Sequence, residues 1–354
     1  MGRPQPLFDN HRDWLAHTLA LNDKPCTKTT LALPGRAQLQ RLDTGLLGYW
    51  PPSGSGASGL ILSAGIHGNE TAPIELLNAM VTELVQGQLQ PRIPLLLILG
   101  NPPAMVRETR FSEHNLNRLF SGAWKDYPDS YETRRASQLE AACQEFARYC
   151  TEAGLPLRHY DLHTAIRASQ REKFALYPFV EGRQVPREEL DLLRLSGIGT
   201  VLLQHQRAST FSGFSSETLG AESFTLELGK VRPFGQNQLS GLSRLRETLI
   251  HLLAEHPFEE SGEADDSEIF QVVHEVIHTG PGFRFHVADD VANFTEFPPD
   301  TLIWNDAERE YRVGEQPEAV IFPNPNVPVG HRVALMIRKT AKAEASAPPD
   351  HTSC

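Results

Sequence analysis

The sequence lacks long hydrophobic runs, an excess of positive charge and a cysteine framework. Its apolar stretches, such as residues 60–62 and 95–99, are far shorter than the ~20 residues that a membrane-spanning helix requires. The 33 Lys and Arg residues are outnumbered by 44 Asp and Glu residues, and the net charge of −11 argues against binding to nucleic acid or to an anionic membrane. Four cysteines without a CxxC pair indicate reduced thiols, and residues 1–25 have no unbroken apolar core. We therefore expect a cytoplasmic protein.

The 354 residues are 40% hydrophobic, which is enough to bury a sizeable core. Short apolar runs alternate with helical patterns from about residue 59 to about residue 254. The expected strands are 59–64, 95–100, 158–163, 173–177, 200–204 and 223–228, and the expected helices are 74–84, 131–153 and 242–252. This alternation predicts an α/β layered fold with a largely parallel or mixed sheet.

The composition changes after residue 256. Residues 257–267 are rich in Glu, Asp, Ser and Gly and read as a linker, and short strand patterns with turn signals follow. We expect one domain over residues 1–256, a smaller β-rich domain over 257–340 and a frayed tail over 341–354. Residues 54–59 match GxGxxG, but this run precedes a strand instead of following one, so we interpret it as a loop and not as a dinucleotide site.

A histidine and a carboxylate follow the first expected strand. His67 and Glu70 are three residues apart at the start of a helix, and this spacing can direct both side chains toward one point. Both are ordinary zinc ligands, and α/β sheets place ligands beyond the carboxyl ends of their strands. HxxE alone is a weak signal, because surface or helix-capping residues produce it as well.

A third candidate ligand stands at the end of another expected strand. His163 follows Asp161 by two residues, so the two side chains share a strand face. Asp161 could then accept a hydrogen bond from the outer N–H of a ligand histidine, although a polar strand end facing water gives the same pattern. Two histidines and one glutamate would leave a coordination position open, as in catalytic zinc sites.

Two further elements fit such a site. Glu227 ends an otherwise apolar strand, where an apolar environment would raise the pKa of its carboxyl group toward neutral pH. It could act as a general base, or equally be a strand residue facing solvent. The run from Arg110 to Arg118 follows the strand at 95–100, and arginines beside a metal bind carboxylates.

Several motifs occur together in a specific order, from about residue 40 to about residue 340. They are GIHGNETAPIEL, NPPAM, NLNRLF, DLHTAIR and TLELGKVRPFGQN. The chain resembles the succinylglutamate desuccinylase family, in the aspartoacylase branch of the zinc carboxypeptidase-like superfamily. The resemblance implies a three-layer α/β/α zinc-peptidase-like domain with a mixed sheet, followed by a smaller β domain that caps the active site.

The resemblance also implies residue roles. His67, Glu70 and His163 would hold one zinc ion, and Glu227 would be the general base. The substrate-binding stretch of the branch matches Arg110, Asn117 and Arg118. The branch usually has Asp at the position of Asn115, which puts a helper role there in doubt.

The implied reaction is hydrolysis of N-succinyl-L-glutamate to succinate and L-glutamate, the last step of arginine catabolism through succinylated intermediates. Arg110 would help to stabilise the oxyanion, and Arg167, just past the third ligand, could hold a substrate carboxylate. The partner is therefore a small anionic substrate, and the sequence does not determine the oligomeric state. The alternatives are another N-acyl amino acid deacylase, a metallocarboxypeptidase and a non-enzymatic zinc-binding module.

Overall fold

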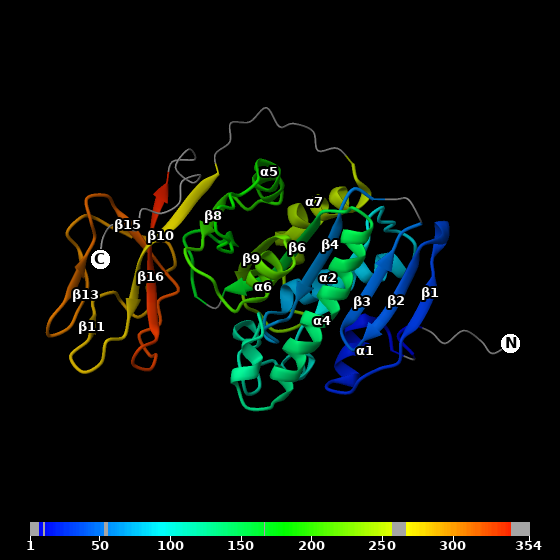
Figure 1. The fold of residues 1–354 in the computed structure, drawn as a ribbon, viewed down its shortest axis with the longest axis horizontal. Helices are drawn as coiled ribbons and strands as arrows, with labels where there is room; N and C mark the ends of the chain where they lie inside the picture. Colours follow the sequence, from blue (N-terminus) through cyan, green and yellow to red (C-terminus); the bar gives the residue numbers. More distant parts are fainter. Residues whose placement is uncertain (1–6, 10, 53–55, 166, 257–266, 341–354) are drawn as a thin grey trace.

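The computed structural model describes residues 7–9, 11–52, 56–165, 167–256 and 267–340. Within these residues a single mixed sheet has 13 strands in the order β1-β2-β3-β5-β4-β6-β9-β7-β8-β10-β16-β15-β12 (Figure 1). Its strands are β1 (Thr29–Ala32), β2 (Gln38–Asp43), β3 (Leu46–Trp50), β4 (Gly59–Ala64), β5 (Leu95–Leu99), β6 (Leu157–Ala165), β7 (Lys173–Tyr177), β8 (Thr200–Leu203), β9 (Glu222–Lys230), β10 (Glu268–Ile277), β12 (Thr295–Phe297), β15 (Glu318–Ile321) and β16 (Arg332–Thr340). A second sheet contains β11 (Arg284–Phe285), β13 (Leu302–Asn305) and β14 (Glu310–Arg312).

Helices lie on both faces of the main sheet. They are α1 (Trp14–Leu21), α2 (Thr71–Val85), α3 (Pro102–Val106), α4 (Tyr131–Glu152), α5 (Arg187–Leu195), α6 (Phe211–Thr218) and α7 (Ser243–Ala254), with 3₁₀ turns η1 (Pro34–Arg36), η2 (Leu116–Arg118), η3 (Ala123–Asp126) and η4 (Leu239–Leu242). No helix among the described residues is both long and apolar enough to cross a membrane.

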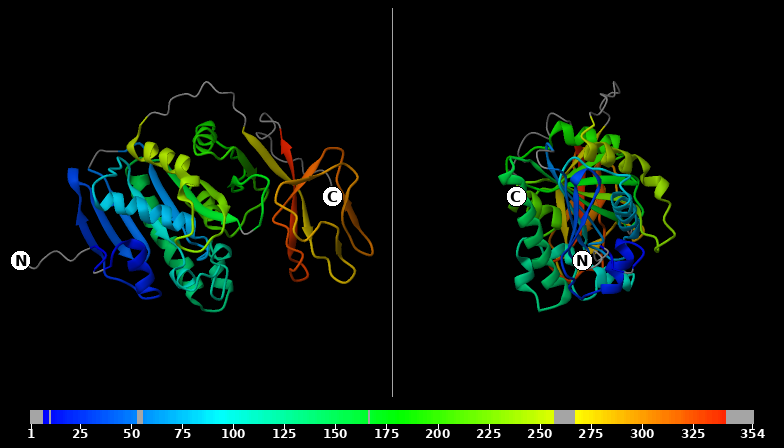
Figure 2. Two further views of the ribbon diagram at one scale, coloured as in Figure 1. Left: turned by 180° about the vertical axis from the view of Figure 1, so that it is seen from behind. Right: turned by 90° about the vertical axis from the view of Figure 1, so that its right-hand side faces the viewer.

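These helices pack against the sheet through two hydrophobic cores. One core packs α1, α2, α5 and α7 against one face and includes Leu77 and Leu249. The other packs α4 and α6 against the opposite face and includes Leu139 and Phe214. Helix α4 lies in front of the sheet in Figure 1, whereas α2 and α7 come to the front when the molecule is seen from behind in Figure 2. The predicted α/β/α arrangement is confirmed.

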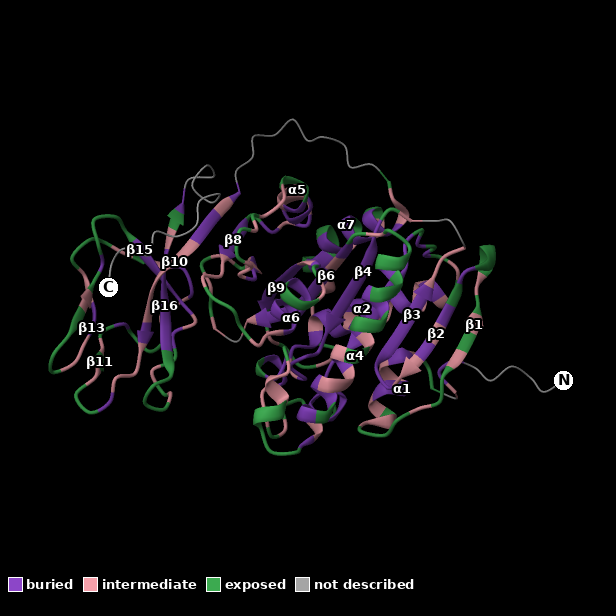
Figure 3. Cartoon of the chain, viewed as in Figure 1, coloured by how far each residue is buried: buried purple, intermediate pink, exposed green. Residues whose placement is uncertain are grey.

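The centre of the sheet is parallel and places the ends of its strands at one edge. Strand β4 pairs in parallel with β5 on one side and with β6 on the other, and β6 pairs in parallel with β9. Every residue of β4 and β5 is buried, as expected for strands covered on both faces (Figure 3). The carboxyl ends of β4, β6 and β9 therefore lie next to one another, which is where ligands bind in such sheets.

The C-terminal strands continue the main sheet. Strand β10 pairs in parallel with β8 and in antiparallel with β16, so the β-rich part is hydrogen-bonded to the α/β part. A further core that includes Val276 and Ile303 fills the space between the two sheets of this part. The β-rich C-terminal part is confirmed, whereas the pairing of β8 with β10 was not predicted. Residues 257–266 of the proposed linker, the tail over 341–354 and residues 54 and 55 of the GxGxxG run lie outside the described residues.

The N-terminal region also adds structure that the sequence analysis did not assign. Strands β1, β2 and β3 form an antiparallel ribbon that joins the sheet through β3 and β5. Helix α1 packs beside α2 in the same core. This ribbon extends the sheet at the end of the molecule opposite to the β-rich part (Figure 1).

Candidate metal and active site

A tight turn between β4 and α2 positions the first two candidate ligands. Gly68 lies against helix α3 so closely that a Cβ there would be 2.2 Å from the carbonyl carbon of Ala104. His67 and Glu70 on this turn are each only 2% exposed. Glu70 directly precedes α2, and its side chain does not cap the helix, so its carboxylate is available for other contacts.

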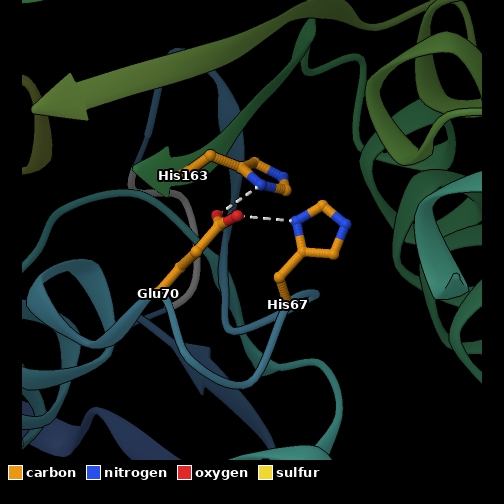
Figure 4. Close-up of side chains that lie close together, drawn as sticks. All are labelled: His67, Glu70 and His163. Carbon is orange, nitrogen blue, oxygen red and sulfur yellow. Dashed lines mark hydrogen bonds and ion pairs between the residues drawn. The ribbon is translucent and has the colours of Figure 1, made fainter. Parts of the chain in front are cut away.

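Strand β6 brings the third candidate to the same place. The Nδ1 atom of His67 lies 2.8 Å from Oε1 of Glu70, and the Nδ1 atom of His163 lies 2.8 Å from Oε2 (Figure 4). One ligand atom from each of the three residues lies within 4.8 Å of the other two. Thr164 also donates its backbone N–H to Oε2 of Glu70 at 3.1 Å. The three predicted ligands are thus adjacent and could hold one metal ion.

The outer nitrogen of each histidine contacts a side-chain oxygen. His163 Nε2 lies 2.8 Å from Oδ2 of Asp161, and His67 Nε2 lies 2.9 Å from Oδ1 of Asn115. Both rings therefore turn Nδ1 toward Glu70. Metal-binding histidines are usually oriented by such acceptors, which also determine the tautomer.

The electrostatics of the cluster follow from its burial and its charge pairs. Burial opposes a charge on His163, but the carboxylates of Asp161 and Glu70 outweigh it and raise the pKa of His163 well above its usual value. Burial alone would raise the pKa of Glu70, yet His67 and His163 hold it well below its ordinary value. Without a metal, His163 is the imidazole that supplies positive charge beside the buried Glu70 carboxylate, because burial lowers the pKa of His67.

A buried chain of polar groups supports Asp161. Ser63 donates its hydroxyl to Oδ1 of Asp161 at 2.6 Å and lies 2.8 Å from Nε2 of His159. The other ring nitrogen of His159 lies 2.7 Å from the hydroxyl of Ser215 on α6. Ser63, His159, Asp161 and Ser215 are all fully buried. The contact of Asp161 with His163 was predicted from the sequence, whereas the polar chain behind Asp161 was not.

Glu227 lies beside the ligands because of strand register. It is the direct partner of His163 in the parallel pair of β6 and β9, so both side chains project from the same face of the sheet. Its Oε2 atom is buried and has no hydrogen-bond partner. Burial, and next the negative charge of Glu70, raise the pKa of Glu227 to about 7. A carboxyl group with such a pKa can both accept and donate a proton near neutral pH.

Arginines and an amide gather at the open side of the cluster. Arg110 donates Nη1 to Oε1 of Glu70 at 2.8 Å and is about one third exposed. Desolvation by nearby protein atoms, followed by the positive charges of Arg332 and Arg110, lowers the pKa of the Arg118 guanidinium to about 10, although the residue is exposed. Asn117 accepts a hydrogen bond from the backbone of Phe211 at 2.9 Å through Oδ1, and in the described part of the chain its Nδ2 donates to no protein atom. These donors suit an anionic ligand.

Arg167 makes its hydrogen bond to the β-rich part and not to the ligand cluster, unlike Arg110. Its Nη1 atom donates to the backbone carbonyl of Asp289 in the β-rich part at 2.6 Å, so it is not bonded to the ligand cluster. Its substrate role stays a prediction. Two other residues near the site were missed as contributors, because Asn115 was noted only as a departure from the family pattern and Arg332 belongs to β16, far along the chain.

The donor set fits zinc. Two imidazole nitrogens and one carboxylate are the ligands of many catalytic zinc sites, which keep a further position for water or substrate. Each histidine has an oxygen acceptor behind it, and the unpartnered Oε2 of Glu227 lies in the same group of side chains. Among the described residues this is the one group of His, Cys, Asp or Glu side chains arranged to hold a metal.

Comparison with known proteins gives a consistent result. A family model for the succinylglutamate desuccinylase/aspartoacylase catalytic domain matches residues 57–253, and a model for the AstE/AspA barrel-sandwich hybrid domain matches residues 265–340. A succinylglutamate desuccinylase of Shewanella sp. (strain MR-7) is 39% identical over 94% of this chain and 97% of its own length. One of Pseudomonas putida (strain KT2440) is 42% identical over 90% of this chain and 95% of its own.

The chain is also similar to solved structures of succinylglutamate desuccinylases. The X-ray structure of a Vibrio parahaemolyticus succinylglutamate desuccinylase has a TM-score of 0.86 and 30% identity, covering 94% of this chain and 96% of that one. The crystal structure of the Chromobacterium violaceum succinylglutamate desuccinylase has a TM-score of 0.82 and 38% identity, covering 93% of this chain and 98% of that one. The chain belongs to the succinylglutamate desuccinylase/aspartoacylase family.

Proposed function

We propose that this protein hydrolyses N-succinyl-L-glutamate to succinate and L-glutamate, using one zinc ion bound by His67, Glu70 and His163. The observation that carries the proposal is the buried His-Glu-His cluster with Glu227 in register beside it. The substrate follows from relatives of about 40% identity, which are named succinylglutamate desuccinylases over nearly their whole length. The reaction is the last step of arginine catabolism through succinylated intermediates.

In the proposed reaction, the metal and the side chains have different roles. Zinc, when bound, polarises the amide carbonyl and lowers the pKa of water. Glu227 would take a proton from the attacking water on Oε2 and return it to the amide nitrogen as the C–N bond breaks, which leaves succinate and the amine of glutamate. Arg110 would donate a hydrogen bond to the carbonyl oxygen as that atom gains negative charge.

The substrate carries three carboxylates, which require cationic partners. Arg118 and the free Nδ2 of Asn117 would hold one of them, and Arg167 is retained as a proposed partner for another. The site thus takes a small anionic substrate. We further propose that residues 1–256 form the catalytic domain and residues 257–340 the domain that caps it, in a cytoplasmic enzyme with reduced cysteines; Cys26, Cys143 and Cys150 are unpaired.

The experiment is amine release from N-succinylglutamate, N-acetylglutamate and N-acetylaspartate, each with zinc-loaded and chelator-treated protein. We expect fast, zinc-dependent release from N-succinylglutamate alone. Preferred turnover of N-acetylaspartate would keep the zinc chemistry and replace the substrate with that of an aspartoacylase. Tightly bound zinc without turnover of any of the three would reject an acyl amino acid hydrolase.

A substitution of Glu227 tests its proposed role as the general base. Glu227→Gln is nearly isosteric and cannot accept the proton, so we expect kcat to fall by about 10²-fold or more while zinc stays bound. Metal content and kcat are the measurements. Glu222→Gln is the matched control, because Glu222 lies on the same strand and bonds to the hydroxyl of Tyr177 instead of lying in the cluster. Near-normal turnover by Glu227→Gln would show that another group moves the proton.

A further inference from the structure

We propose that the β-rich part orients Arg167 for binding a carboxylate of the substrate, with Asn293 as the positioning residue. The inference rests on the proposed function, because Arg167 is assigned there to an anionic substrate. It adds that the catalytic part does not fix the position of this arginine by itself. The substrate site is therefore complete only with the β-rich part in place.

The segment that follows the ligand strand β6 pairs with the β-rich part through its backbone. Asn293 donates its backbone N–H to the carbonyl of Ala168 at 2.9 Å, and its own carbonyl accepts the N–H of Gln170 at 3.0 Å. Together these bonds form a parallel β-bridge. Two bonds to one residue fix both the position and the direction of the segment, which contains Arg167 and lies just beyond the ligand His163.

The side chain of Arg167 is held by the same loop of the β-rich part. Its Nη1 atom donates at 2.6 Å to the backbone carbonyl of Asp289, four residues before Asn293. A guanidinium has five N–H donors in a planar fork, so this bond orients the plane and leaves further donors for a carboxylate. No acceptor for these remaining donors is present within the described ranges of the chain.

The neighbouring Arg171 shows the contrast with Arg167. Arg171 donates Nε and Nη2 to the two carboxylate oxygens of Glu268 at 2.6 and 3.1 Å, so its fork is occupied and its charge is paired. Arg167 is held by a neutral carbonyl, which leaves its positive charge for a ligand. The two arginines therefore have different roles: Arg171 attaches the segment, and Arg167 is presented by it.

Asn293 is itself anchored within the β-rich part. The residue is 1% exposed, and its Oδ1 atom accepts the backbone N–H of Phe322, just after β15, at 2.9 Å. Phe294 and Phe322 have positive φ angles of 64° and 54°. Such angles are uncommon for bulky residues and persist only where the surrounding structure enforces them. The fold thus maintains two unfavourable backbone conformations at the residues that adjoin and anchor Asn293.

Two substitutions and their combination test whether Asn293 acts through Arg167. Asn293→Ala removes the bond to Phe322 and should raise KM about 10-fold, while kcat and zinc affinity change less than about 2-fold, because the metal ligands are untouched. Arg167→Gln removes the fork and should raise KM by a similar factor. In the double variant KM should rise no further than in Arg167→Gln alone, because the side chain that Asn293 positions is already absent.

This comparison separates positioning from mere attachment of the β-rich part. If Asn293→Ala raises KM by the same factor with and without Arg167, or lowers kcat as strongly as it raises KM, the inference is overturned. An unchanged KM in Arg167→Gln would overturn it as well. Asn305→Ala is the matched control and should leave KM unchanged, because Asn305 bonds to Nε2 of His286 at 2.6 Å but lies in the second sheet.

A milder variant serves if Asn293→Ala does not fold, as judged by thermal melting. Gln170→Ala removes only the bond from Nε2 of Gln170 to the hydroxyl of Thr295 at 3.2 Å, so we expect KM to rise a few-fold. The increase should vanish in the Arg167→Gln background. An increase that persists there would reject positioning of Arg167 by the β-rich part.

The inference and the proposed function can fail separately. If the unchanged protein hydrolyses a different N-acyl amino acid, the proposed substrate fails, and the same variants are compared with the substrate that is turned over. If it hydrolyses none, calorimetric titration of the zinc-loaded variants with N-succinylglutamate replaces KM. Weaker binding by Asn293→Ala that depends on Arg167 would then support the inference, and equal binding by all variants would overturn it.

Discussion

At the scale of single residues, Glu70 is the centre of the site. Its two carboxylate oxygens accept from His67, His163, Arg110 and the backbone of Thr164, all at 2.8–3.1 Å. An unpaired carboxylate buried to this degree would be very costly, and these donors offset the cost. A metal ion held by His67, Glu70 and His163 would supply positive charge beside this carboxylate.

The raised pKa of His163 predicts how zinc binding depends on pH. The metal-free protein keeps a proton on this imidazole to a higher pH than a free histidine would, and zinc must displace that proton. Zinc affinity should therefore fall as the pH is lowered, by about 10-fold per pH unit while one proton is displaced. Chelator competition between pH 6 and pH 8 measures this slope.

Asp161→Asn tests the cause of the slope. Loss of the carboxylate removes the group that does most to raise the pKa of His163, so the pH dependence should become shallower. Zinc affinity at pH 8 should also fall 10- to 100-fold, because an outer acceptor is weakened. A slope identical to that of the unchanged protein would show that Asp161 does not control the proton on His163.

At the scale of secondary-structure elements, the site depends on where strands end and how tightly the next turn is packed. Strands β4, β6 and β9 supply the turn with His67, the residue His163 and the residue Glu227 respectively. The turn after β4 passes against the backbone of α3 at Gly68, where no side chain fits. This close approach places His67 within reach of a ligand on β6.

Gly68→Ala should disrupt this turn. The new methyl group would meet backbone atoms of Ala104 and Met105 at 2.2–2.3 Å, and backbone yields less easily than a flexible side chain. We expect a loss of about 3 kcal/mol in the free energy of unfolding, with weakened zinc binding, because His67 must shift. Urea titration and chelator competition provide the two measurements.

Gly199→Ala is the control for this substitution. Nothing lies within 4 Å of a Cβ at Gly199, so stability and zinc binding should change little. Equal effects of the two glycine substitutions would mean that the approach of α3 does not position His67.

At the scale of the whole molecule, the β-rich part is attached to the catalytic part by main-chain and ionic contacts. Besides the parallel pairing of β8 and β10, Arg171 donates to Glu268 on β10 at 2.6 Å. This attachment holds the first residue of β16, Arg332, close enough to lower the pKa of Arg118. Arg332 lies 3.6 Å from Glu275 on the neighbouring strand β10, and it adds a third guanidinium to those of Arg110 and Arg118.

Arg332→Gln should therefore weaken the binding of an anionic substrate without changing the chemical step. We expect KM for N-succinylglutamate to rise several-fold, kcat to change little, and the increase in KM to shrink at high salt, where charge interactions are screened. Steady-state kinetics at two ionic strengths measure this. Arg338→Gln, on the same strand near Tyr311, is the control and should leave KM unchanged. A kcat effect as large as the KM effect would contradict a role in substrate attraction alone.

Local patterns were sufficient for much of the fold. Short apolar or strand-like runs predicted β4, β6 and β9, and the helical repeat of Leu77 and its neighbours predicted α2. The spacing of His67, Glu70 and His163 at strand ends indicated a common site before any contact was known, and the resemblance supplied the family. Such features are readable because strand and helix periodicity is a property of neighbouring residues.

The sequence by itself thus determined the layered α/β fold, the β-rich C-terminal part and the position of the candidate ligands along the chain. Only the tertiary structure decided that β10 continues the sheet, that Asn115 faces His67, and that Arg332 lies near Arg118. These contacts join residues that are 48 or more positions apart, and their hydrogen bonds and charges leave no periodic pattern in the sequence. They depend on how complete elements pack together, which local propensity does not specify.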